Sequence, residues 1–192
     1  ITGKLNADLG AESVDHDIAL VEGLQAAPEE SPSFLELAGK DRETLLTGLQ
    51  ARFNIGQFIQ GENVPASLAG LHGTNKRGLE FYLLHALYDI AGAAGQFVQN
   101  GSVIMTEPTY QGFKLAIDSI NELLQGASLT EVYDSFLKGK MQSCELDITK
   151  PEQRAVARLA CMLRYSDKKD VAELQEVFAS LHPNIQAILE QE

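Results

Sequence analysis

One stretch, residues 76–99, constrains the fold of this chain more than any other. Between Leu79 and Val98, apolar residues occupy nearly every side of the helix that the pattern predicts, whereas a surface helix keeps one polar face. Such a helix has to be covered by other helices on several sides, because exposed apolar surface is unfavourable in water. We therefore expect an all-α fold in which residues 76–99 form a buried central helix.

Helix patterns and helix-start signals also occur along the rest of the chain. Ser128 and Glu131 have the spacing of a capping box, and apolar residues follow them at helical intervals. Thr149 and Glu152 repeat this spacing, while Asp41 suits the N-cap of an earlier helix. These signals predict eight or nine helices, packed as a bundle-like or orthogonal array around the central helix.

Chain length and a proline-rich turn indicate how the chain is divided. A chain of 192 residues suits one large helical domain with an N-terminal appendage. Pro28 and Pro32 interrupt the first helix pattern, since proline ends or kinks a helix. We therefore expect residues 1–30 to form an N-terminal segment with one helix, and residues 31–192 to form a single helical domain.

Composition and charge limit the kinds of partner. The chain has 15 Lys and Arg against 27 Asp and Glu, and its net charge of −12 repels nucleic acids and anionic membrane surfaces. No apolar run has the length of a membrane span, because His85, Asp89 and Gln96 interrupt the central stretch. Cys144 and Cys161 form neither a disulfide framework nor a zinc motif. We expect a soluble acidic protein, with the cytoplasm as the favoured compartment.

A line of polar and small residues runs along the central stretch. Spacings of four and three place these residues on one helix face: Gly78, Tyr82, His85, Asp89, Gly92 and Gln96. Asp89 can orient the imidazole of His85 and raise its basicity, so that His85 acts as a base or a ligand. We expect a pocket there, with Tyr82 as a hydrogen-bond donor and Gln96 on its wall. The alternative is a buried hydrogen-bonded network that fixes helix packing.

Residues just before the central stretch add two further hypotheses. Together with His85 and Asp89, His72 would complete a two-histidine, one-carboxylate site for a divalent metal such as iron or zinc. Lys76 and Arg77 follow a glycine-containing loop at the start of the helix, where they can anchor an anionic group. The alternatives are an exposed loop histidine and two solvated basic side chains.

These observations support two hypotheses about function. The first is an enzyme or small-molecule-binding domain that uses the polar pocket, with metal-assisted hydrolysis or oxidation of a small acidic molecule as its chemistry. The second is a non-catalytic interaction or oligomerisation module that binds a basic partner or a second copy. Ile185, Ile188 and Leu189 would then supply a homodimer contact. The sequence leaves both hypotheses open.

Overall fold

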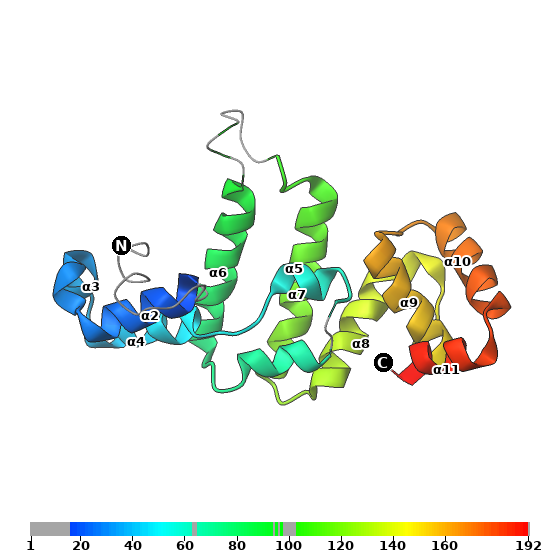
Figure 1. The fold of residues 1–192 in the computed structure, drawn as a ribbon, viewed down its shortest axis with the longest axis horizontal. Coiled ribbons are helices and arrows are strands. Elements are labelled where there is room, and N and C mark those ends of the chain that lie inside the picture. The colour runs from blue at the N-terminus through cyan, green and yellow to red at the C-terminus, as the bar shows by residue number, and fades with distance from the viewer. Residues whose placement is uncertain (1–15, 63–64, 94, 96, 98–102, 192) are drawn as a thin grey trace. The chain divides into compact units, whose positions relative to one another are not determined.

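The computed structural model describes residues 16–62, 65–93, 95, 97 and 103–191 (Figure 1). Every regular element in these ranges is an α-helix or a short 3-10 helix, so the predicted all-α class is confirmed. The chain divides into two compact units, residues 1–52 with 70–88 and residues 53–69 with 89–192. The domain boundary predicted at residue 30 stays a prediction. None of the helices in the described ranges is long and apolar enough to cross a membrane.

The first unit consists of short helices around a small apolar core. Its elements are α2 (His16–Ala26), η1 (Pro28–Glu30), α3 (Pro32–Glu36), α4 (Gly39–Leu49) and most of α6 (Lys76–Gly92). Helix α2 contacts η1 and α4, and the core side chains come from α2, α3 and α4: Val21, Leu24, Phe34 and Leu49. Phe81 packs against this cluster, so the N-terminal half of α6 is anchored in the unit.

Helices α4 and α6 approach closely at a pair of glycines. A Cβ atom at Gly48 would meet the Cδ1 atom of Phe81 and would lie 3.0 Å from the carbonyl oxygen of Gly78. A Cβ atom at Gly78 would lie 2.9 Å from the Cγ2 atom of Thr47. Glycine at both positions therefore permits this helix contact, because any larger residue would push the two helices apart.

This contact predicts whether an alanine substitution stabilises or destabilises the protein. We expect Gly48→Ala to lower the free energy of unfolding by about 1–3 kcal/mol, because Phe81 and the backbone of α6 have to move. Gly39→Ala in the same helix is the matched control, since a Cβ atom there meets nothing within 4 Å. That control should gain less than the roughly 1 kcal/mol of an interior helix position, because Gly39 is the first residue of α4. Urea unfolding followed by far-UV circular dichroism measures both, and a stabilised Gly48→Ala variant would contradict the close contact.

The second unit holds the longer helices. Its elements are α5 (Ile55–Ile59), α7 (Glu107–Leu123), α8 (Leu129–Lys140), η3 (Gln142–Cys144), α9 (Pro151–Leu163), α10 (Lys168–Ser180) and α11 (Pro183–Gln191), while η2 (Ala66–Leu71) begins here and ends in the first unit. Helix α7 packs on α5 and α8, and α9 packs on α8, α10 and α11 (Figure 1). Large side chains fill the core: Phe58, Phe113, Ile120, Tyr133 and Phe136.

The predicted helix starts have mixed outcomes. The capping box at α8 is confirmed, because the Ser128 hydroxyl accepts from the Glu131 N–H and the Glu131 carboxylate accepts from the Ser128 N–H. The box predicted at Thr149 is wrong, since its hydroxyl donates to Asp147 at 2.6 Å and α9 begins at Pro151 without a side-chain cap. The predicted N-cap at Asp41 is also wrong, because α4 begins two residues earlier.

Helix α6 begins where the central helix was predicted and differs from it in extent and surroundings. It ends at Gly92, and residues 96 and 98–99 lie outside the described part of the chain. Its buried residues form one face: Gly78, Leu79, Tyr82 and Leu83. On the opposite face Leu84 and Tyr88 are 50% and 68% exposed. The central, buried position that the apolar pattern predicts for this helix is therefore not confirmed.

Candidate functional site

The polar residues predicted on one face of α6 lie in different surroundings. The side chain of Tyr82 is buried in the first unit. His85 and Asp89 are both exposed, and the imidazole of His85 stacks on Phe81 with ring centroids 6.4 Å apart. Gln96 lies outside the described residues. A catalytic role for Tyr82, His85 and Asp89 stays a prediction, since the structure gives these three no common buried environment.

The basic residues at the start of α6 are engaged in ion pairs. Lys76 lies 3.9 Å from the carboxylate of Glu80, and Arg77 donates to Asp41 on α4 at 3.1 Å. All four side chains are about half exposed or more, so each pair contributes roughly 0.2–1 kcal/mol. These pairs place carboxylates beside both basic side chains, and an anionic ligand would have to compete with those carboxylates.

The described residues contain no group of three or more His, Cys, Asp and Glu side chains placed to hold one metal ion. His72, His85 and Asp89, the predicted ligands of a divalent metal, are among these described residues and form no such group. His72 is exposed in the turn before α6. A metal ligated by these three residues has no support in their geometry, and a metal cofactor stays a prediction.

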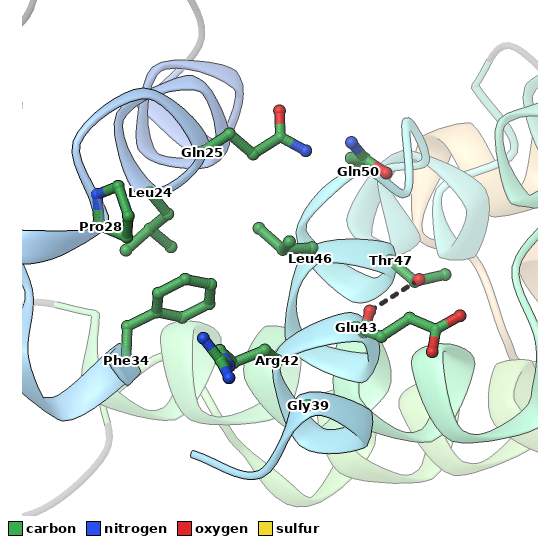
Figure 2. A pocket seen from close by; sticks show the side chains of 10 residues that line it. All are labelled: Leu24, Gln25, Pro28, Phe34, Gly39, Arg42, Glu43, Leu46, Thr47 and Gln50. Atoms are coloured by element: carbon green, nitrogen blue, oxygen red, sulfur yellow. Dashed lines mark hydrogen bonds between the residues drawn. The ribbon is translucent and has the colours of Figure 1, made fainter. Parts of the chain in front are cut away.

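A hollow of about 530 Å³ lies within the first unit (Figure 2). Leu24 on α2, Pro28 in η1 and Phe34 on α3 form one apolar wall, and Leu46 on α4 faces them (Figure 2). Polar side chains occupy the rim: Gln25, Arg42, Glu43, Thr47 and Gln50. Small-molecule sites in proteins typically have volumes of roughly 300–1,000 Å³, with apolar walls and a few placed polar groups. The volume of this open hollow lies within that range, and its lining combines apolar walls with polar groups.

Arg42 is the distinctive polar group of this hollow. Its guanidinium carbon lies 6.0 Å from the centroid of the Phe34 ring, which is within the range of a cation–π contact. Within the described ranges this guanidinium has no carboxylate partner, in contrast to Arg77 on α6. The Thr47 hydroxyl donates to the backbone carbonyl of Glu43 at 2.8 Å, so that hydroxyl is already bonded within its own helix. Arg42 is thus a positive group available to a ligand.

Sequence reasoning missed this hollow. Its lining comes from residues 24 to 50, where helical spacing predicts apolar faces but not how three short helices meet. Arg42 stands between Asp41 and Glu43 in the sequence, which reads as a solvated charged turn. The segment from Pro28 to Pro32 was one available signal, because proline ends α2's helix pattern there and the structure has the short helix η1 followed by α3.

Two polar side chains, those of Cys161 and Tyr133, are buried in the core of the second unit. Burial raises the pKa of the Cys161 thiol from 9.0 to about 12, and the positive charge of Lys140 opposes the change. Burial also raises the pKa of the Tyr133 phenol, whose hydroxyl has no hydrogen-bond partner among the described residues. A thiol with a raised pKa is a poor nucleophile at neutral pH, since the thiolate is the reactive form. The surroundings of Cys161 therefore do not activate its thiol as a nucleophile.

The raised pKa of Cys161 predicts a loss of stability in alkaline solution. The folded state favours the protonated thiol, so this contribution is complete below pH 9 and is lost as the pH rises towards 12. Between about pH 8 and about pH 10.5, the wild type should lose about 2 kcal/mol more unfolding free energy than Cys161→Ala. Urea unfolding at the two pH values measures the difference. An equal loss in both proteins would show that the thiol does not titrate in this way.

Comparison with known proteins identifies a family but no activity. The model of a family of unknown function (DUF6829) matches residues 3–192, and the chain belongs to that family. No curated protein and no solved structure matches the chain.

Proposed function

We propose that this member of the family of unknown function DUF6829 is a small-molecule-binding domain whose site is the hollow between α2, α3 and α4. The ligand is a small carboxylate with an apolar body. The observation that carries the proposal is the guanidinium of Arg42, which lies over Phe34 at an apolar hollow without a carboxylate partner in the described part of the chain. The proposal keeps the small acidic ligand expected from the sequence and moves its site away from α6.

The apolar walls account for the body of the ligand. Leu24 and Phe34 are held in the core of the first unit, and each presents only a small exposed part to a hydrocarbon chain or ring in the hollow. Leu46 points towards them from α4 (Figure 2). Burial of apolar surface contributes about 25 cal/mol per Å². A ligand without an apolar part would forgo this contribution.

The rim accounts for the carboxylate. Arginine can bind a carboxylate through two parallel hydrogen bonds, which are charge-assisted and stronger than bonds between neutral groups. The amides of Gln25 and Gln50 lie on the other side of the opening and can donate to a second oxygen (Figure 2). The carboxylate of Glu43 is also on the rim and repels an anion. Arg42 therefore sets the preference for acids, and Glu43 limits it.

Calorimetric titration with three probes of equal chain length tests this proposal. Octanoate should bind the wild type, while octanol and octylamine should bind more weakly. Arg42→Gln should weaken octanoate binding about tenfold or more, since the hydrogen-bonded charge contact is worth about 1.5–3 kcal/mol, and should leave octanol unaffected. Glu43→Gln is the matched variant on the same rim and should tighten octanoate binding. Equal octanoate affinity in the wild type and Arg42→Gln would overturn the proposal.

The exposed face of α6 favours a second candidate function, self-association. Leu84 and Tyr88 stand four residues apart on this face, and apolar side chains with this spacing are typical anchors of helix pairs. In the predicted dimer contact on α11, Ile185 and Ile188 are also exposed, and Leu189 is half-buried. Sedimentation over a wide concentration range distinguishes the two faces. Dimerisation that is lost in Tyr88→Ser and kept in Ile188→Ser would assign the contact to α6. A monomer at all concentrations would exclude a dimer contact on α6 and on α11 alike.

A further inference from the structure

A second hollow, independent of the proposed carboxylate site, lies between α9, α10 and α11 in the second unit, and it has a volume of about 340 Å³. Val156 on α9 and Phe178 on α10 are nearly fully buried, and together with Ala179 they form its apolar floor. The remaining lining is polar: Glu152, Gln153, Gln175, Gln186 and Glu190. Among the described residues that line it there is no lysine or arginine. We name this site the α9–α11 groove.

The two carboxylates of the groove come from different helices. Glu152 lies in the first turn of α9 and Glu190 lies near the end of α11. Among the described residues neither carboxylate has an ion-pair or hydrogen-bond partner, whereas the amides of Gln153 and Gln186 bond to the backbone. The groove therefore presents two carboxylates without a salt-bridge partner in the described part of the chain, beside an apolar floor.

Helix ends of both signs lie near the groove. Gln186 donates to the carbonyl oxygens of Phe178 and Ala179 at 2.8 and 3.2 Å, which shows that the last turn of α10 faces the groove. Helix α11 ends at Gln191, next to Glu190. Each helix C-terminus carries a partial negative charge and each N-terminus a partial positive one, so the ends of α10 and α11 are opposed by the start of α9 beside Glu152 and the start of α11 beside Gln186. The net charge of −12 on the whole chain favours association with cationic partners in general.

We propose that the α9–α11 groove is a docking site for a lysine or arginine side chain of a basic segment in a partner protein. The aliphatic part of such a side chain would lie on Val156 and Phe178, while its charged end reaches Glu152 and Glu190. The hollow has room for one long side chain rather than a whole helix. Charge complementarity thus selects the occupant, because an acidic or neutral segment would leave both carboxylates unpaired.

Fluorescence anisotropy with a labelled probe peptide tests this proposal on the full chain. The probe is a short, acetylated and amidated peptide that alternates leucine and lysine, and glutamine replaces lysine in its control. The double variant Glu152→Gln, Glu190→Gln should bind the lysine peptide about tenfold more weakly than the wild type, with the difference shrinking at high salt. Glu29→Gln, Glu30→Gln makes the same change in net charge in the first unit and should change affinity less than twofold.

Three results would overturn the proposal. Equal losses in the two double variants would mean that the peptide responds to net charge alone. Equal binding of the lysine and glutamine peptides would remove the role of the cation. Spermidine that binds more tightly than the peptide, with the same dependence on Glu152 and Glu190, would make a free amine the occupant instead of a protein segment.

Discussion

Phe58→Ala is expected to lower the free energy of unfolding by about 3–5 kcal/mol, because it empties the centre of the aromatic cluster in the second unit. The Phe58 side chain has no exposed surface, and its ring centroid lies 4.8 Å from that of Phe136 and 5.6 Å from those of Phe53 and Tyr133. Helix α5, which carries Phe58, has only five residues. So short a helix depends on such packing rather than on its own hydrogen bonds.

Urea unfolding followed by far-UV circular dichroism measures this loss. Tyr133→Phe is the matched control in the same cluster, since it keeps the ring and removes a buried hydroxyl that has no hydrogen-bond partner among the described residues. That variant should be as stable as the wild type or more stable by up to about 1 kcal/mol. A loss below about 1 kcal/mol for Phe58→Ala would mean that α5 does not anchor the unit as described.

Among glycine-to-alanine substitutions in the first unit, Gly70→Ala is expected to be the most destabilising. It should lower the free energy of unfolding by about 3 kcal/mol or more. A Cβ atom at Gly70 would overlap the carbonyl oxygen of Arg52, a backbone atom that cannot rotate away. The two residues also share a hydrogen bond of 3.2 Å from the Arg52 N–H to the Gly70 carbonyl. The chain leaves the first unit after Arg52 and returns to it at Gly70. The added methyl group would therefore force apart the outgoing and returning segments of the backbone.

Thermal unfolding and urea unfolding of Gly70→Ala measure this effect. Gly39→Ala again serves as the control, because both substitutions add one methyl group to the first unit and only one of them meets backbone. A Gly70→Ala protein with wild-type stability would mean that Arg52 and Gly70 are not in contact.

Local features of this fold could be predicted from the sequence wherever neighbouring residues decide them. The capping box of Ser128 and Glu131 forms, and hydrogen bonds from Ser128 lower the pKa of Glu131. The same spacing at Thr149 does not form a box, because Asp147 lies two residues away and accepts from the Thr149 backbone N–H as well as its hydroxyl. Spacing alone does not include such competing acceptors.

The surroundings of α6 could not be predicted from the sequence, for a different reason. Its apolar residues predict burial on most sides, yet Leu84 and Tyr88 are exposed in the structure. An apolar pattern indicates how much apolar surface a helix has. It does not indicate which part of the chain, or which partner, buries that surface. The polar line along this helix was predicted from spacing alone, and spacing does not distinguish the buried Tyr82 from the exposed His85.

The proposed carboxylate site depends on tertiary geometry that no short motif encodes. Phe34 on α3 and Arg42 on α4 are separated by a helix boundary, and their contact depends on how these two helices are placed in the fold. Arg42 also lies among charged neighbours that resemble any solvated helix start. The sequence therefore predicted an acidic ligand from other basic residues, Lys76 and Arg77, which the structure pairs with carboxylates.

Amide NMR spectra of the full chain, recorded during a titration with octanoate, test the central claim most directly. The account predicts saturable shifts of the side-chain amides of Gln25 and Gln50 and of the Arg42 guanidinium, and predicts that Arg42→Gln greatly reduces the shifts of the two amides at the same octanoate concentration. Shifts centred on His85 and Asp89 instead would return the site to α6 as the sequence predicted. The absence of any saturable shift would contradict ligand binding in the hollow between α2, α3 and α4.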